Sequence, residues 1–188
     1  MSQLPLLPIL PALLCALALP GLQAFQPRPT QPQKLAPYVS SPQPLVAKML
    51  ELSGLKQGET VFDLGSGDGR ILIAAARDFG ARAVGVELSG VLARRSREQA
   101  ELLGLGNRIE VIEGDLLTVD LKDADVVSLY LMTEANAQLR PKLERELKPG
   151  TRVVSLEFEI RGWKPVKVEK FTAHRHDYKI YLYEIPAK

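Results

Sequence analysis

Short apolar runs alternate with amphipathic stretches over most of the chain. The runs are bounded by glycines, acids or loops, which is typical of buried strands in a parallel sheet. The stretches between them repeat apolar residues every three or four positions and are followed by glycine, as helices commonly are. This pattern predicts strands at residues 61–64, 82–87, 109–112, 126–131 and 152–160, and helices at residues 44–55, 70–79, 91–103 and 135–147.

The last part of the chain has another pattern, in which apolar and polar residues alternate. Two such stretches, VKVEKFTAH and DYKIYLYEI, follow one another closely and predict an antiparallel pair of strands. The expected fold is therefore an α/β, doubly wound sheet that is mostly parallel, covered on both faces, and extended by an antiparallel C-terminal hairpin. Ligands of such sheets bind beyond the carboxyl ends of the strands, near the point where the strand order reverses.

The first 36 residues do not follow either pattern. Residues 4–26 are apolar and carry no charge, which is typical of a targeting or membrane segment. A cleaved export signal ending at residue 24 is favoured, and an uncleaved membrane anchor is the alternative. Residues 25–36 are rich in proline and glutamine and predict an extended linker. The folded domain is expected to span residues 37–188, in a protein that is exported or tethered to a membrane.

Charge and cysteine content narrow the classes of partner. The 188 residues include 24 Lys and Arg and 22 Asp and Glu, and the resulting formal charge of +2 does not indicate a nucleic-acid partner. The single cysteine excludes an internal disulfide and a zinc site built from cysteines. His174 and His176 have no matching ligand cluster in the sequence, so we expect no metal site.

The candidate site begins with the stretch TVFDLGSGDGR, in which a predicted strand enters a loop with three glycines. Gly65 and Gly67 allow a tight turn and let backbone N–H groups approach a ligand, and the next glycine gives G-x-G-x-G rather than the G-x-G-x-x-G of dinucleotide sites. Asp63 and Asp68 would each repel a pyrophosphate by about 1 kcal/mol or more. The loop therefore predicts a cationic nucleoside, S-adenosylmethionine. A helix N-cap role for Asp68 is the alternative.

Two further acids follow strand ends. Glu87 lies 22 residues after Gly65, where a carboxylate can accept both hydroxyls of a ribose. A solvated carboxylate is the alternative there. Asp115, in the stretch EGDLL, can accept from an adenine amine while Leu116 packs near the base. An aspartate that only forms a turn is the alternative for that position.

In their order along the chain, these motifs resemble those of class I S-adenosylmethionine-dependent methyltransferases, which have a Rossmann-like sheet. The resemblance rests on VFDLGSGDG, VGVE, EGDLL and DVVSLYL. The stretches PYVSSPQPLVAKMLEL, LYLMTEANAQLRPKLERELKPGTRVVS and RGWKP further resemble one family of protein-lysine methyltransferases. That family includes enzymes that methylate the ATP synthase c subunit or the adenine nucleotide translocase. Its upstream motif usually reads Y-x-P-[ST]-P, and this chain has YVSSP, which lacks the middle proline.

The resemblance implies a role for each motif residue. Glu87 is implied to bind the ribose and Asp115 the adenine. Tyr38 and Pro42 are implied to form a lid. The wall near the methyl group is implied to consist of Ser128, Leu129 and Tyr130, and the methionine and ribose side is implied to be bound by Asp63, Gly65, Ser66, Gly67 and Gly69.

Methyl transfer is an in-line displacement that needs aligned reactants and little water. Tyr130 is predicted to orient the nucleophile, with filling of the strand end as the alternative. Glu134 and Glu157 can attract a cationic lysine, with a surface role as the alternative. The chain has no N-P-P-Y or D-P-P-Y after the fourth strand, which disfavours methylation of base amino groups.

The expected function is therefore protein-lysine N-methylation with S-adenosylmethionine as the methyl donor. We expect a monomer whose partner is a protein that presents a lysine, including the possibility of a membrane protein, and no nucleic-acid partner. Two alternatives stay open. One is a methyltransferase for a small molecule or RNA, and the other is a cofactor-binding module without turnover.

Overall fold

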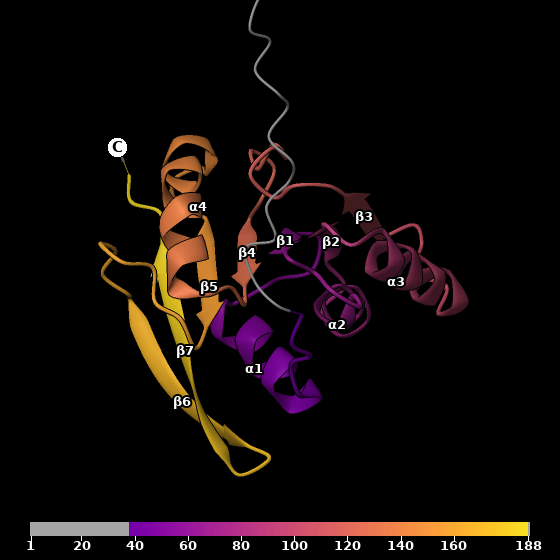
Figure 1. Ribbon diagram of the computed structural model, residues 1–188, viewed down its shortest axis with the longest axis horizontal. Helices are drawn as coiled ribbons and strands as arrows, with labels where there is room; N and C mark the ends of the chain where they lie inside the picture. The colour runs from indigo at the N-terminus through magenta and orange to yellow at the C-terminus, as the bar shows by residue number, and fades with distance from the viewer. Residues whose placement is uncertain (1–37, 188) are drawn as a thin grey trace, which may run out of the picture. The chain divides into compact units, whose positions relative to one another are not determined.

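A seven-stranded sheet forms the centre of the part of the chain that the computed structural model describes, residues 38–187 (Figure 1). The predicted signal or anchor at residues 1–24 and the linker at residues 25–36 lie outside the described residues. No helix within residues 38–187 is long and apolar enough to cross a membrane. The strands are β1 (Thr60–Leu64), β2 (Arg82–Glu87), β3 (Ile109–Glu113), β4 (Val126–Leu129), β5 (Arg152–Leu156), β6 (Lys167–Ala173) and β7 (His176–Glu184).

The sheet has the strand order β3-β2-β1-β4-β5-β7-β6. Strands β1 to β5 pair in parallel, whereas β7 lies between β5 and β6 and is antiparallel to both. The predicted mostly parallel sheet with an antiparallel hairpin is therefore confirmed. The strand order reverses between β1 and β4, which are neighbours. Their carboxyl ends consequently form the crevice in which such folds bind ligands.

Helices cover both faces of the sheet, because alternate strand residues point to opposite sides and are apolar on both. On one face Val61 and Ala83 pack among three helices, and on the other Phe62 and Val84 pack with the fourth helix and the segment 116–124. Each fully buried aliphatic side chain contributes about 1.5–3 kcal/mol. The first group contains α1 (Gln43–Leu52), α2 (Arg70–Asp78) and α3 (Gly90–Leu102), and the second contains α4 (Thr133–Glu146).

Two strands are shorter than their apolar patterns predicted. β5 ends at Leu156 rather than at residue 160, because Glu157 has a φ of 64° and turns the chain away from the sheet. β4 ends at Leu129, two residues before the predicted end at residue 131. The apolar residues beyond both ends, such as Leu131 and Ile160, are still buried. An apolar pattern reports burial, and burial here continues after strand pairing has ended.

The turn between β6 and β7 consists of His174 and Arg175, with Ala173 and His176 paired across it. The two turn residues have φ values of 48° and 64°. Positive φ at both central residues is the geometry of a type I′ turn, which asparagine followed by glycine adopts readily. Histidine and arginine adopt it at a cost in free energy, so the hairpin turn is strained.

Replacing this turn by Asn-Gly, with His174→Asn and Arg175→Gly together, is expected to raise the free energy of unfolding by about 1 kcal/mol. The gain arises because both new residues tolerate positive φ. Urea denaturation of the purified protein measures the change. Arg175→Ala is the control, since it removes the side chain and keeps the strained backbone, and it should give no gain. Equal or lower stability of the double variant would contradict turn strain.

Candidate functional site

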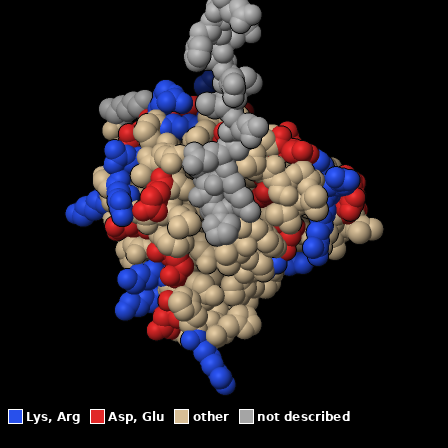
Figure 2. All heavy atoms as spheres, viewed as in Figure 1, with Lys and Arg blue, Asp and Glu red and all other residues tan. Residues whose placement is uncertain are grey.

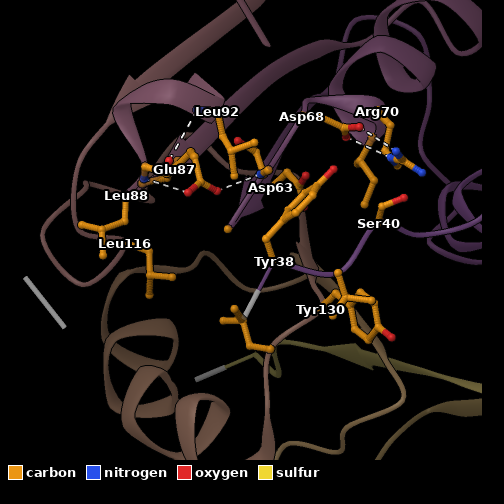
Figure 3. A pocket seen from close by; sticks show the side chains of 18 of the residues that line it. Tyr38, Ser40, Asp63, Asp68, Arg70, Glu87, Leu88, Leu92, Leu116 and Tyr130 are labelled. Carbon is orange, nitrogen blue, oxygen red and sulfur yellow. Dashed lines mark hydrogen bonds and ion pairs between the residues drawn. The ribbon is translucent and has the colours of Figure 1, made fainter. Parts of the chain in front are cut away.

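A cavity of about 280 Å³ lies at the carboxyl ends of the four strands β1 to β4. Loops that follow these strands line it, together with residues 38–41 that precede α1. Of the predicted cofactor and catalytic residues, all except Gly69 line this one cavity: Tyr38, Asp63, Gly65, Ser66, Gly67, Glu87, Asp115, Leu116 and Tyr130. The structure therefore brings together residues that are far apart in the sequence (Figure 3).

The glycine loop after β1 is fixed by backbone hydrogen bonds to β2. Gly65 N and Ser66 N both donate to Val86 O, at 2.8 and 3.1 Å. Gly67 has a φ of 55°, and a Cβ at this position would lie 2.6 Å from the Tyr38 ring. The absence of a side chain thus lets the aromatic ring pack over the loop, across the cavity in Figure 3. A larger residue at position 67 would displace that ring.

Glu87, at the end of β2, is held by two backbone donors. Gly67 N donates to Oε2 and Ser89 N donates to Oε1, each at 2.8 Å. A carboxylate has about four acceptor positions, so both oxygens can still accept from a diol. The side chain is half-buried at the cavity, which excludes the alternative of a freely solvated carboxylate. Its role toward a ribose stays a prediction.

Asp63 is the last residue but one of β1, beside its partner in β4, Ser128, and is only 5% exposed. Burial raises the pKa of Asp63 to about 7. The nearby Ser128 hydroxyl, which lies outside hydrogen-bond geometry, lowers the pKa in part, and the negative charges of Glu87 and Asp68 raise it. The carboxyl therefore keeps its proton up to nearly neutral pH. A cation in the cavity would favour its ionised form.

Asp68 forms a bidentate ion pair with Arg70, with Nε to Oδ1 at 2.9 Å and Nη2 to Oδ2 at 2.6 Å. These bonds hold the pKa of Asp68 below its usual range. The predicted alternative of an N-cap was wrong, because Gly69 occupies the cap position of α2 with a φ of 80° and no side-chain cap bond. Arg70 also donates to Ser41 O, which ties the glycine loop to the segment before α1. The arginine offsets much of the negative charge that the sequence placed in this loop.

Asp115 follows β3 and makes the hydrogen bonds of a turn. Its Oδ1 accepts from Leu117 N at 2.9 Å, and its carbonyl oxygen accepts from Thr118 N at 2.9 Å. The turn role proposed as an alternative is therefore present, while the residue also lines the cavity. Leu116 is 9% exposed and lies with Leu88 on the Glu87 side of the cavity (Figure 3). This end offers apolar side chains to a flat base.

Tyr130 lies at the other end of the cavity from Glu87 (Figure 3). Its ring stacks on Phe158 with 6.4 Å between centroids and 30° between planes. Burial raises the pKa of Tyr130, and the charges of Tyr178 and Glu157 raise it further, so the hydroxyl stays protonated at neutral pH. A neutral hydroxyl can donate one hydrogen bond and accept others. Tyr130 therefore both fills the strand end and presents a polar group.

Several predicted residues lie behind the cavity rather than on its surface. Gly69 packs against α3, where a Cβ would collide with the hydroxyl of Ser96. Pro42 is the N-cap of α1, and Ser128 and Leu129 are fully buried in β4. These positions set the distance between elements that carry the lining residues. Their implied contacts with a cofactor stay predictions.

Sequence reasoning missed part of the lining. Ser89 and Leu92 belong to the start of α3, and the Ser89 hydroxyl accepts from Leu92 N at 3.5 Å as the N-cap of that helix. A serine directly before an amphipathic stretch was the signal that could have located this helix end at the site. Arg70 was missed as well, because pairing with Asp68 two positions away depends on the loop geometry.

The residues present fit S-adenosylmethionine. The loop leaves no room for a Cβ at Gly67, and the cavity contains a buried carboxyl at Asp63 that a cation would ionise. Ser66 Oγ is buried against Gly85 and has no hydrogen-bond partner among residues 38–187. The apolar side chains beside Glu87 suit the base of a nucleoside.

The chain is similar to known lysine methyltransferases. Residues 63–167 match the family model described as the ANTKMT methyltransferase domain. The chain is 47% identical over 150 residues to a protein-lysine N-methyltransferase of Saccharolobus islandicus, covering 79% of this chain and 93% of that protein. It is 38% identical over 132 residues to the adenine nucleotide translocase lysine N-methyltransferase of Mus musculus, covering 70% of this chain but only 57% of the mouse protein.

Solved structures with the same fold have been crystallised with S-adenosyl-L-homocysteine. One, an RNA methyltransferase from Salinibacter ruber, is 41% identical, with a TM-score of 0.75 over 80% of this chain and 95% of that one. Another, an S-adenosylmethionine-dependent methyltransferase from Thiobacillus denitrificans, is 28% identical, with a TM-score of 0.53 over 61% of this chain and 47% of that one. The chain therefore belongs to the ANTKMT methyltransferase family and is an S-adenosylmethionine-dependent methyltransferase with the class I fold.

Proposed function

We propose that this enzyme methylates the side-chain amine of a lysine in a protein. The observation that carries the proposal is the 47% identity to a protein-lysine N-methyltransferase over 93% of that protein's length. The site agrees with it. The cavity has a nucleoside-like end at Glu87 and Leu116 and an aromatic, hydroxyl-bearing end at Tyr130, where an acceptor amine can approach.

Each residue of the site has a separate role in the reaction. When bound, S-adenosylmethionine supplies a methyl group activated by its sulfonium. Glu87 and Asp115 hold the nucleoside, and the buried carboxyl of Asp63 offsets positive charge. Tyr38 covers the glycine loop and excludes water, and Tyr130 orients the acceptor nitrogen. Alignment of the two reactants in a dry site is the main contribution that such an enzyme makes.

An RNA acceptor is the second candidate, since a solved relative with 41% identity is described as an RNA methyltransferase. Proteins that bind RNA usually present a strongly basic surface. Here the formal charge is only +2, and acidic and basic groups lie beside one another on the face that Figure 2 shows. These features favour a protein acceptor.

The acceptor that we propose is a membrane protein, and the apolar residues 4–26 would bring the enzyme to the same membrane. The cavity supports this choice, because two residues that line it, Tyr38 and Val39, are 46% and 56% exposed. An apolar rim is suited to an apolar partner.

To test the proposal, the full chain and methyl-labelled S-adenosylmethionine are incubated with separated membrane, soluble and RNA fractions of the source cells. Label is expected in the membrane fraction, in a protein whose acid hydrolysate contains methyl-lysine. Label confined to soluble protein would contradict a membrane acceptor but would leave lysine methylation standing. Label in RNA or in small molecules, or no transfer to any fraction, would contradict lysine methylation.

Glu87→Gln is expected to weaken binding of S-adenosylmethionine about tenfold to a hundredfold, which corresponds to about 1.5–3 kcal/mol for hydrogen bonds to a charged group. Isothermal titration calorimetry measures the affinity. The matched control is Glu113→Gln, because Glu113 is the register partner of Glu87 in β3 but is exposed and outside the cavity. Equal affinities for the two variants would remove Glu87 from the binding site.

Cofactor affinity is expected to fall as the pH falls below about 7, the pKa of Asp63 in the free protein. A cation in the cavity lowers that pKa, so binding releases a proton and becomes weaker in acid, by up to about tenfold per pH unit. Titrations between pH 5 and pH 7 measure the slope. Asp63→Asn should abolish it. A wild-type affinity that does not change with pH would contradict a charge change at Asp63.

The same carboxyl affects the stability of the cofactor-free protein in the opposite direction. The folded pKa of about 7 lies above the ordinary aspartate value near 4, so the folded state keeps a proton that the unfolded state loses. The free energy of unfolding should therefore decrease as the pH rises from about 4 to about 7, by at most about 1.4 kcal/mol per pH unit. Urea denaturation of the wild type and of Asp63→Asn across this range should show the decrease in the wild type only.

A further inference from the structure

Glu157, the first residue after β5, has an unusual backbone conformation. Its φ is 64°, in the left-handed region that non-glycine residues adopt only at a cost in free energy. Within residues 38–187, the other non-glycine residues with positive φ are His174 and Arg175, which form a tight hairpin turn. Glu157 is instead the central residue of a three-residue turn, in which Phe158 N donates to Leu156 O at 2.7 Å. A strained residue beside a ligand cavity is a candidate for a role in function.

Hydrogen bonds to the start of β7 hold Glu157 in this conformation. Glu157 N donates to Lys179 O, and Lys179 N donates to Glu157 Oε1, both at 2.7 Å. The other carboxylate oxygen has no hydrogen bond to residues 38–187, and His176 Nε2 lies 3.9 Å from it. One oxygen is thus anchored, and the other is free to accept. The side chain is 25% exposed.

The position of Glu157 relates it to the acceptor end of the cavity. β4 and β5 are paired in parallel, and β5 extends one residue further, to Leu156. Tyr130 and Glu157 therefore follow the ends of neighbouring strands, with Glu157 one residue further along. Phe158, next in the chain, stacks on the Tyr130 ring. The hydroxyl of Tyr130 points away from Glu87 (Figure 3). Glu157 does not line the cavity itself, and its charge is close enough to Tyr130 to raise the pKa of that residue.

We infer that the carboxylate of Glu157 binds the ammonium group of the target lysine and positions it at the Tyr130 end of the cavity. The inference rests on the proposed lysine methylation. A carboxylate that is anchored through one oxygen can form a short, charge-assisted hydrogen bond to an ammonium group through the other, and it repels a phosphate. The strained backbone is what aims this oxygen, because an extended residue at position 157 would continue β5. Glu157 thus selects a cationic acceptor, which then loses one proton to water so that its nitrogen lone pair can attack the methyl carbon.

Three variants of the full chain test this role: Glu157→Gln, which removes the charge, Glu157→Gly, which also relieves the strain, and Glu159→Gln, which removes an exposed charge two residues away. The probe is a dilution series of the extract fraction that the wild type labels from methyl-labelled S-adenosylmethionine. Both Glu157 variants should raise the apparent KM for the acceptor about tenfold or more. Their affinity for S-adenosylmethionine should stay within about twofold of wild type, and Glu159→Gln should match wild type in both values.

Thermal unfolding separates this role from a purely structural one. Glycine adopts a φ of 64° without strain, which offsets the lost bond to Lys179, so the midpoint of Glu157→Gly should stay within about 3 °C of wild type. An unchanged acceptor KM in either Glu157 variant would overturn the inference and leave lysine methylation standing. A large fall in the midpoint together with lost cofactor binding would also overturn it. A wild type that transfers label to no lysine would refute both proposals.

Discussion

Two loops from different strands meet at the carboxylate of Glu87. One oxygen accepts from Gly67 in the loop after β1, and the other accepts from Ser89 at the start of α3. Without this bridge two backbone N–H groups at a half-buried position would lose their partners, at about 1–3 kcal/mol each. This bridge supports the tight path of the glycine loop, over which the ring of Tyr38 packs, and the start of α3 at the Glu87 side of the cavity.

The sheet positions the two loops that Glu87 connects. β1 pairs in parallel with both β2 and β4, so the carboxyl ends of the three strands lie at one edge of the sheet. The strand order reverses between β1 and β4, which leaves space between the loops that follow these two strands. Charge within that space is low for a site rich in acids. Arg70 balances Asp68, and burial keeps a proton on Asp63. Glu87 and Asp115 are therefore the lining carboxylates that no basic side chain within residues 38–187 balances, and a cationic ligand adds another negative charge by ionising Asp63.

Most of the fold was readable from the sequence, because periodicities of two and of three to four residues report directly which side chains are buried. The gathering of Asp63, Glu87 and Asp115 at one edge was also predictable, since each lies at or just after the carboxyl end of a predicted parallel strand. Three features were not. The neutral state of Asp63 depends on depth of burial, the pairing of Asp68 depends on the loop path, and the turn at Glu157 depends on bonds to β7, more than 20 residues later. The acidic loop thus indicated the right ligand, although its negative charge in the folded protein is smaller than its number of acidic residues suggests.

The order of the last strands affects how the chain is completed during synthesis. β7 is the final strand made, yet it lies between β5 and β6. Until it emerges from the ribosome, β5 has a bare backbone edge and β6 has no partner in the sheet. Bare edges of this kind are where nascent chains pair with one another and aggregate. Lys179, which anchors Glu157, belongs to the same strand, so the proposed acceptor side of the enzyme is completed only at the end of translation.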